Sequence, residues 1–131
     1  KKLILLTLLL VCGITFVAAQ KGAEIHFESK THDFGDVSMS NPIFKCVFPF
    51  TNTGDEALFI NNVKTSCHIC MKAIYPTDSI KPGETGEIEI IYDTTNHNRF
   101  PGAFRKVYTV YINGTTNFTR LYIKGRKVED K

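Results

Sequence analysis

Hydrophobic and polar side chains alternate with a period of two along most of the chain after residue 20. The clearest run places Phe44, Cys46, Phe48 and Phe50 on one side, with Lys, Val and Pro between them. This alternation is typical of β-strands with one buried face, so we expect Cys46 to lie in a core among phenylalanines. Turn-forming Gly, Pro, Asn and Asp residues separate such runs. The pattern predicts strands over residues 24–28, 33–38, 43–52, 57–65, 71–76, 86–93, 105–112 and 118–125.

The number and spacing of these strands indicate the fold class. No stretch repeats apolar residues at the helical spacing of three and four. Seven to eight short strands in about 110 residues favour an all-β fold, an immunoglobulin-like antiparallel β-sandwich. Antibody domains are excluded, because the chain has no Trp and its Cys spacing does not match their inter-sheet disulfide.

The first residues have the features of an export signal. Lys1 and Lys2 precede a long apolar run, which ends in a Val-Ala-Ala sequence at Ala19. We therefore expect a signal peptide over residues 1–19 and a single domain over residues 20–131. Two alternatives are a membrane anchor, for which 17 residues are short, and a lipid on Cys12. Cleavage after Ala19 would leave a periplasmic or secreted chain with no membrane span.

Removal of the signal also changes the charge. The formal net charge is +3, and loss of the two leading lysines leaves 14 basic residues against 13 acidic ones. A nearly neutral chain without a Lys/Arg run lacks the footprint of a nucleic-acid binder. With 43% hydrophobic residues, it has enough apolar side chains for a core.

The segment Cys67-His68-Ile69-Cys70-Met71 concentrates the chemistry of the chain. In an oxidising compartment two cysteines at this spacing can form a local disulfide, which leaves Cys46 as a buried thiol. In another form of this interpretation, the disulfide joins Cys67 or Cys70 to Cys46. A second interpretation is a redox pair, although no helix follows to lower the thiol pKa. A third is a Cu(I) or Zn(II) site made by Cys67, His68, Cys70 and Met71, to which His32 or His97 would add if the loops meet.

Other candidate sites lie on strands and turns. Tyr111 and Tyr122 fall on the side opposite the core and would form an exposed binding surface if the last two strands are neighbours. The alternative is that the N-terminal strand covers this sheet. Asp78-Ser79-Ile80 and Asp93-Thr94-Thr95 resemble an O-glycosylation signal, which makes Ser79 and Thr94 candidates. The motifs of hydrolases, nucleotide-binding loops and zinc proteases are absent from the sequence, so we expect no enzyme and no cofactor.

Five segments in order resemble the bacterial family called domain of unknown function 1573. They are His32-Asp33-Phe34-Gly35-Asp36-Val37, Phe48-Pro49-Phe50-Thr51-Asn52-Thr53-Gly54, Asn62-Val63-Lys64-Thr65-Ser66-Cys67, Ile80-Lys81-Pro82-Gly83-Glu84-Thr85-Gly86-Glu87-Ile88 and Pro101-Gly102-Ala103-Phe104-Arg105-Lys106. The resemblance implies a secreted or periplasmic immunoglobulin-like fold, related in shape to modules of pilus chaperones, and no activity. The family has one residue between its paired cysteines, whereas this chain has two.

Together these observations favour a non-enzymatic binding or structural module of the cell envelope. We expect it to act through strand edges and loops, on an unidentified protein or glycan of the envelope, as a monomer or weak oligomer. The alternative is a thiol-redox or Cu/Zn-binding protein that uses the Cys67–Cys70 loop.

Overall fold

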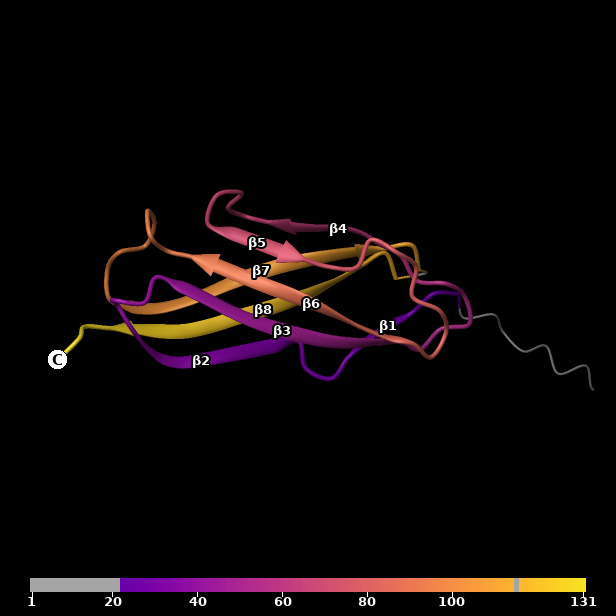
Figure 1. Ribbon diagram of the computed structural model, residues 1–131, viewed down its shortest axis with the longest axis horizontal. Coiled ribbons are helices and arrows are strands. Elements are labelled where there is room, and N and C mark those ends of the chain that lie inside the picture. The colour runs from indigo at the N-terminus through magenta and orange to yellow at the C-terminus, as the bar shows by residue number, and fades with distance from the viewer. Residues whose placement is uncertain (1–21, 115) are drawn as a thin grey trace, which may run out of the picture.

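The computed structural model describes residues 22–114 and 116–131, which form eight β-strands (Figure 1). The expected signal peptide over residues 1–19 and Cys12 lie outside the described residues. Within the described part, no helix is long and apolar enough to cross a membrane. The strands are β1 (Ile25–Phe27), β2 (Thr31–Ser38), β3 (Ile43–Asn52), β4 (Ile60–Thr65), β5 (Met71–Ile74), β6 (Thr85–Asp93), β7 (Gly102–Ile112) and β8 (Phe118–Val128).

Two four-stranded sheets pack face to face as a sandwich. One sheet has the order β1-β3-β6-β5 and the other has the order β2-β8-β7-β4 (Figure 1). Consecutive strands therefore often lie in different sheets, as in immunoglobulin-like domains. The prediction of an all-β, immunoglobulin-like sandwich is confirmed. One pairing differs from the expected antiparallel pattern, because β2 runs parallel to β8, at the edge of its sheet.

All eight predicted strands are present, with ends that differ from the prediction by no more than three residues. The largest differences are at the start of β4, at the start of β7 and at the end of β8. Residues 57–59 were expected in β4, but Leu58 instead forms an isolated bridge to Ile80. The alternation continues through that bridge, which explains why the sequence did not show where β4 begins.

The core lies between the sheets and is rich in aromatic rings. Along β3, buried and exposed residues alternate, and Cys46 is buried between Phe44 and Phe48 as expected. Near one end of the sandwich, the rings of Phe44, Tyr92 and Phe104 pack together, with centroids 5.5–6.1 Å apart. Burying these rings supplies much of the apolar surface that the fold removes from water.

At the other end of the sandwich, Asn52 joins the β3–β4 loop to the β5–β6 loop from a fully buried position. Its amide nitrogen donates to the carbonyl oxygens of Glu56 and Ile80, at 2.8 and 2.9 Å. Its side-chain oxygen accepts a hydrogen bond from the backbone N–H of Gly54, at 3.0 Å. Gly54 is required here, because a Cβ at this position would lie 2.0 Å from the carbonyl oxygen of Gly22.

Candidate functional site

The turn between β4 and β5 holds the two closely spaced cysteines. Cys67 and Cys70 are joined by a disulfide, with Cα atoms 5.6 Å apart. The backbone N–H of Met71 donates to the carbonyl oxygen of Cys67 at 3.1 Å, and the hydroxyl of Thr65 donates to the same oxygen. These contacts close the turn directly before β5, where the sequence analysis expected no helix. No helix dipole therefore acts on either sulfur.

The four candidate metal ligands of this segment do not converge. Cys67 and Cys70 share the disulfide, and the Met71 side chain is buried in the core. The Met71 sulfur accepts a hydrogen bond from the Ser66 hydroxyl at 3.6 Å, while His68 is exposed on the turn. Within residues 22–114 and 116–131, no group of three His, Cys, Asp or Glu side chains is placed to hold a metal ion.

A hollow of about 560 Å³ lies beside the disulfide. His97 lines this hollow together with Cys67 and Cys70. Two cationic side chains, Arg105 and Lys106, also line it. The sequence analysis considered two distant histidines, His32 and His97, as further ligands. Of these, His97 lines the same hollow as the cysteines.

The loop that carries His97 is anchored by a buried lysine that the sequence analysis did not single out. Lys127 on β8 is 3% exposed, and its Nζ donates to the hydroxyl of Thr94 at 2.8 Å and to the carbonyl oxygen of Asn98. Burial lowers the pKa of this lysine. Asn98 in turn donates to the Tyr92 hydroxyl at 3.3 Å, so the loop is fixed from two sides.

The two glycosylation candidates lie in different environments. Thr94 is only 2% exposed, and its hydroxyl donates to the carbonyl oxygen of Pro42 while it accepts the hydrogen bond from Lys127. A glycan on Thr94 would break both contacts, so the folded structure argues against this candidate. Ser79 is exposed and stays a candidate.

The third cysteine of the described region lies away from the turn. Cys46 is free and buried, and burial raises its pKa to about 11. A thiol with this pKa is almost fully protonated at neutral pH and makes a poor nucleophile or metal ligand. The variant pairing of Cys46 with Cys67 or Cys70 does not occur, because those two sulfurs are bonded to each other.

Tyr111 and Tyr122 lie on one face, as the sequence analysis required for a binding surface. Strands β7 and β8 are neighbours, and both rings are half-buried on the outer side of their sheet. The ring of Tyr111 lies 6.1 Å from that of Phe118. The N-terminal strand does not cover this face, because β1 is paired with β3 at the edge of the other sheet.

The basic residues around these tyrosines were not among the binding candidates predicted from the sequence. Arg120, Lys124 and Arg126 alternate with buried residues along β8, as does Tyr122. This alternation was the signal that could have revealed them, because residues two apart on a strand share a face.

The packed sheets and the disulfide turn define the class of protein, an immunoglobulin-like β-sandwich domain. The chain belongs to the family described as Protein of unknown function (DUF1573), whose model matches residues 25–127. Comparison with curated protein sequences finds no match.

Several solved structures share the fold. A protein of unknown function from Porphyromonas gingivalis W83 is similar, with a TM-score of 0.65 and 18% identity over 86% of this chain and 51% of that one. The VesB protease of Vibrio cholerae is similar with a TM-score of 0.58 and 11% identity, over 81% of this chain and 31% of that one. The YadV chaperone has a TM-score of 0.54 and 14% identity, over 82% and 52%. This chain thus spans about half, or less, of each of these proteins, and identities this low show the fold alone.

Proposed function

We propose that this protein is an exported, non-enzymatic binding module of the cell envelope, and that it acts through the open edge of β5 and the loops beside it. Export rests on the signal-like residues 1–19, which would place the domain in the periplasm or outside the cell. The observation that carries the binding role is the exposed edge of β5, which is paired on one side, with β6.

The backbone of β5 offers hydrogen-bonding groups to an added strand. The N–H of Asp93 donates to the carbonyl oxygen of Cys70 at 2.7 Å, so Cys70 directs its backbone towards β6. Because this direction alternates along an antiparallel pair, Ala73 directs its N–H and C=O away from β6. An extended peptide can bind to such an edge through its own backbone.

Exposed apolar side chains flank this edge. Ile69 is 72% exposed on the disulfide turn, and Ile74 is 58% exposed at the end of β5. The edges formed by β1, β2 and β4 are less regular, because β1 has three residues, and the pairings of β2 and β4 contain register shifts. The disulfide between Cys67 and Cys70 holds the turn that leads into β5. In this proposal the disulfide holds the start of β5 in one conformation, so that its edge is ready to bind.

The test is photo-cross-linking in whole cells from a reactive amino acid placed at Ile74, with Val47 as the control position. Val47 is also an exposed apolar residue on the same sheet, but it lies on β3, which β6 separates from β5. We expect an adduct with an envelope component from position 74, and its loss in Ala73→Pro, which removes the outward N–H. Equal adducts from both positions, or adducts that persist in Ala73→Pro, would contradict edge binding.

A thiol or metal function is the second candidate, and the hollow that joins His97 to Cys67 and Cys70 favours it. Arg105 and Lys106 line the same hollow, and nearby cations stabilise a thiolate. Intact-mass and metal analysis of protein from its native envelope, with and without reductant and alkylation, separates the two functions. One disulfide, one free thiol and an N-terminus at Gln20 would support the exported binding module. Three alkylatable thiols with bound copper or zinc would support the second candidate.

A further inference from the structure

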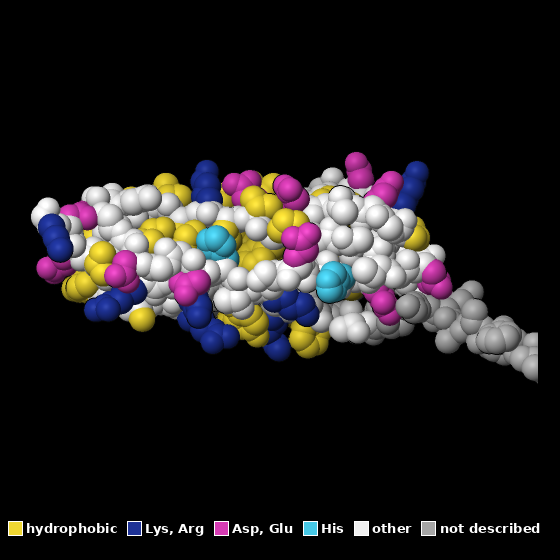
Figure 2. Space-filling model, turned by 90° about the horizontal axis from the view of Figure 1, so that it is seen from below, with side chains coloured by type: hydrophobic (Ala, Val, Ile, Leu, Met, Phe, Trp, Pro, Cys, Tyr) yellow, Lys and Arg dark blue, Asp and Glu magenta, His cyan; other side chains and the backbone are white. Residues whose placement is uncertain are grey.

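The outer face of the β2-β8-β7-β4 sheet gathers positive charge. Strand register places Arg105 beside Lys124, and places Lys64 and Arg120 on either side of Thr109. We call the cations of this surface the basic face, and its members are Lys64, Arg105, Arg120, Lys124 and Arg126. All five are exposed. Figure 2 views the sandwich edge-on and shows Lys and Arg side chains, with hydrophobic ones between them, along its lower side.

Aromatic rings lie beneath the cations of this face. The guanidinium of Arg105 is 4.6 Å from the centroid of the Tyr122 ring, and the ammonium of Lys64 is 5.1 Å from that of Tyr111. The guanidinium of Arg120 is 5.0 Å from the Phe118 ring. Cation–π contacts hold these charges against the sheet, which leaves their outer N–H groups available to an anion.

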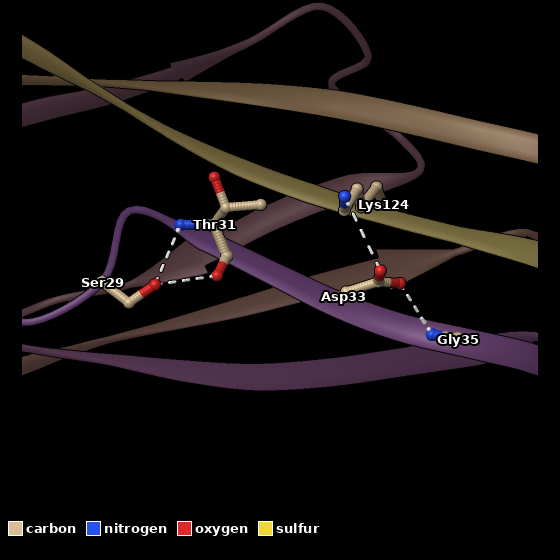
Figure 3. A network of polar contacts seen from close by, with 5 residues as sticks. All are labelled: Ser29, Thr31, Asp33, Gly35 and Lys124. Atoms are coloured by element: carbon tan, nitrogen blue, oxygen red, sulfur yellow. Dashed lines mark hydrogen bonds and ion pairs between the residues drawn. The ribbon is translucent and has the colours of Figure 1, made fainter.

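Acidic side chains are few on this face and lie at its edge. Asp33 on β2 is 3.7 Å from the ammonium of Lys124, and its other oxygen accepts the N–H of Gly35 (Figure 3). Asp36 lies opposite Arg126 in the register. Two carboxylates therefore face five cations, and both belong to the edge strand.

The opposite face of the sandwich has the reverse balance. Three acidic residues of β6, Glu87, Glu89 and Asp93, point outward there, and two lysines, Lys45 and Lys72, accompany them. The nearly neutral chain thus carries its positive excess on one sheet, which gives the molecule a polarity that the net charge conceals.

The basic face has an elongated shape. Arg120, Tyr122, Lys124 and Arg126 follow one another at every second position of β8, a stripe of about 20 Å at the rise of an antiparallel strand. Beside it, a hollow of about 480 Å³ is lined by Arg105, Lys124 and Arg126, and the carboxylates of Asp33 and Asp36 lie at its β2 side. A linear polymer with regularly spaced anionic groups matches this stripe in charge and in length.

We propose that the basic face binds an anionic polysaccharide, a glycan chain whose sugars carry carboxylate groups, laid along β8. Arginine binds carboxylates in a bidentate manner, and the tyrosine hydroxyls can hydrogen-bond to sugar hydroxyls. Single-stranded nucleic acid fits less well, because the rings on which bases would stack are covered by the chain's own cations. An acidic protein fits less well, because the centres of protein interfaces are depleted of charge.

The experiment measures binding of the purified protein to fluorescently labelled polygalacturonate by anisotropy. Dextran is the neutral glycan, and oligothymidylate and polyglutamate are the alternative polyanions. The double variant Arg120→Gln/Lys124→Gln removes two charges from the basic face. Its matched control, Lys45→Gln/Lys72→Gln, removes two exposed charges from the opposite face, where both residues lie beside Ile91. Thermal unfolding checks that both variants are folded.

We expect polygalacturonate to bind the wild type in preference to dextran, and to bind more weakly as salt is added. The basic-face variant should lose roughly tenfold in affinity, and the control about twofold or less. The edge variant Ala73→Pro should bind as the wild type does, so this proposal and the function proposed for β5 can fail separately. Equal losses in the two double variants, equal binding to dextran, or tighter binding to oligothymidylate or polyglutamate would each overturn the proposal.

Discussion

Replacement of Asn52 tests how far one buried polar side chain holds the loops of this sandwich in place. The side chain is 0% exposed, and it makes three hydrogen bonds of ordinary length to the backbone of Gly54, Glu56 and Ile80. Asn52→Ala removes these three bonds, together with a longer one from the backbone N–H of Glu24 at 3.4 Å, and leaves a small cavity. Water cannot replace them without entering the core, so their loss should appear in the free energy of unfolding.

The magnitude follows from these contacts. Each bond contributes about 1 kcal/mol net, and more where its partner is left unsatisfied. The Ile80 oxygen keeps a second partner, the N–H of Leu58 at 2.9 Å. Removal of its bond to Asn52 should therefore cost only the net free energy of one hydrogen bond. We expect Asn52→Ala to lower the free energy of unfolding by about 3 kcal/mol, a large part of the 5–15 kcal/mol that is typical of a domain.

Urea unfolding at equilibrium, with linear extrapolation, measures this loss. Asn113→Ala is the matched control, because Asn113 also holds two backbone groups, at 2.8 and 3.0 Å, but is exposed. Its loss should be about 1 kcal/mol or less, since water replaces the bonds. A loss below about 1 kcal/mol for Asn52→Ala, or equal losses for the two variants, would refute the reasoning.

Asn52→Asp adds a pH test at the same position. At neutral pH the new carboxylate would face the carbonyl oxygens of Glu56 and Ile80 in place of the amide that donates to them. Burial and these oxygens would raise the folded-state pKa of the carboxyl above its unfolded value. The variant should therefore be most destabilised at neutral pH, and should regain stability as the pH falls towards about 4. Destabilisation that does not vary with pH would contradict this account.

Three further predictions concern the cysteines and one glycine. With a pKa of about 11 and a buried position, Cys46 should resist alkylation of the native protein at pH 8 and react after unfolding; rapid native labelling would contradict its burial. Reduction of the Cys67–Cys70 disulfide should lower the free energy of unfolding by about 2 kcal/mol or less, because the closed loop is short, and calorimetry with and without reductant measures this. Gly54→Ala should lower it by more than about 2 kcal/mol, because the added Cβ meets backbone atoms, and an unchanged midpoint of urea unfolding would exclude that clash.

The sequence predicted strands such as β3 because their buried and exposed residues alternate from one end to the other. The run from Phe44 to Phe50 shows this, since every second residue faces the core along β3. The partner of each strand was not predictable in the same way. Alternation describes which face a residue occupies and carries no information on the neighbouring strand, so the parallel pairing of β2 with β8 was missed.

The candidate site was predictable only where its residues are close in sequence. The spacing of Cys67 and Cys70 made a local disulfide one of three interpretations of this segment, and the structure contains that disulfide. The local motif made Thr94 a glycosylation candidate, and its burial was not predictable, because Pro42 and Lys127, which hydrogen-bond to its hydroxyl, are both distant in sequence. The hollow beside the disulfide depends in the same way on a loop that returns His97 to the cysteines.

The position of β8 affects the order in which the fold can be completed. This strand lies between β2 and β7, so β2 has its place in the sheet only once β8 is present. The pairing of Thr31 with Tyr122 spans most of the domain, and contacts so distant in sequence form slowly. During synthesis, β2 would remain unpaired until β8 has left the ribosome. A chain that must remain unfolded to be threaded across a membrane would be helped by this delay, whereas one that stops before β8 would leave β2 unpaired and one edge of β7 open to aggregation.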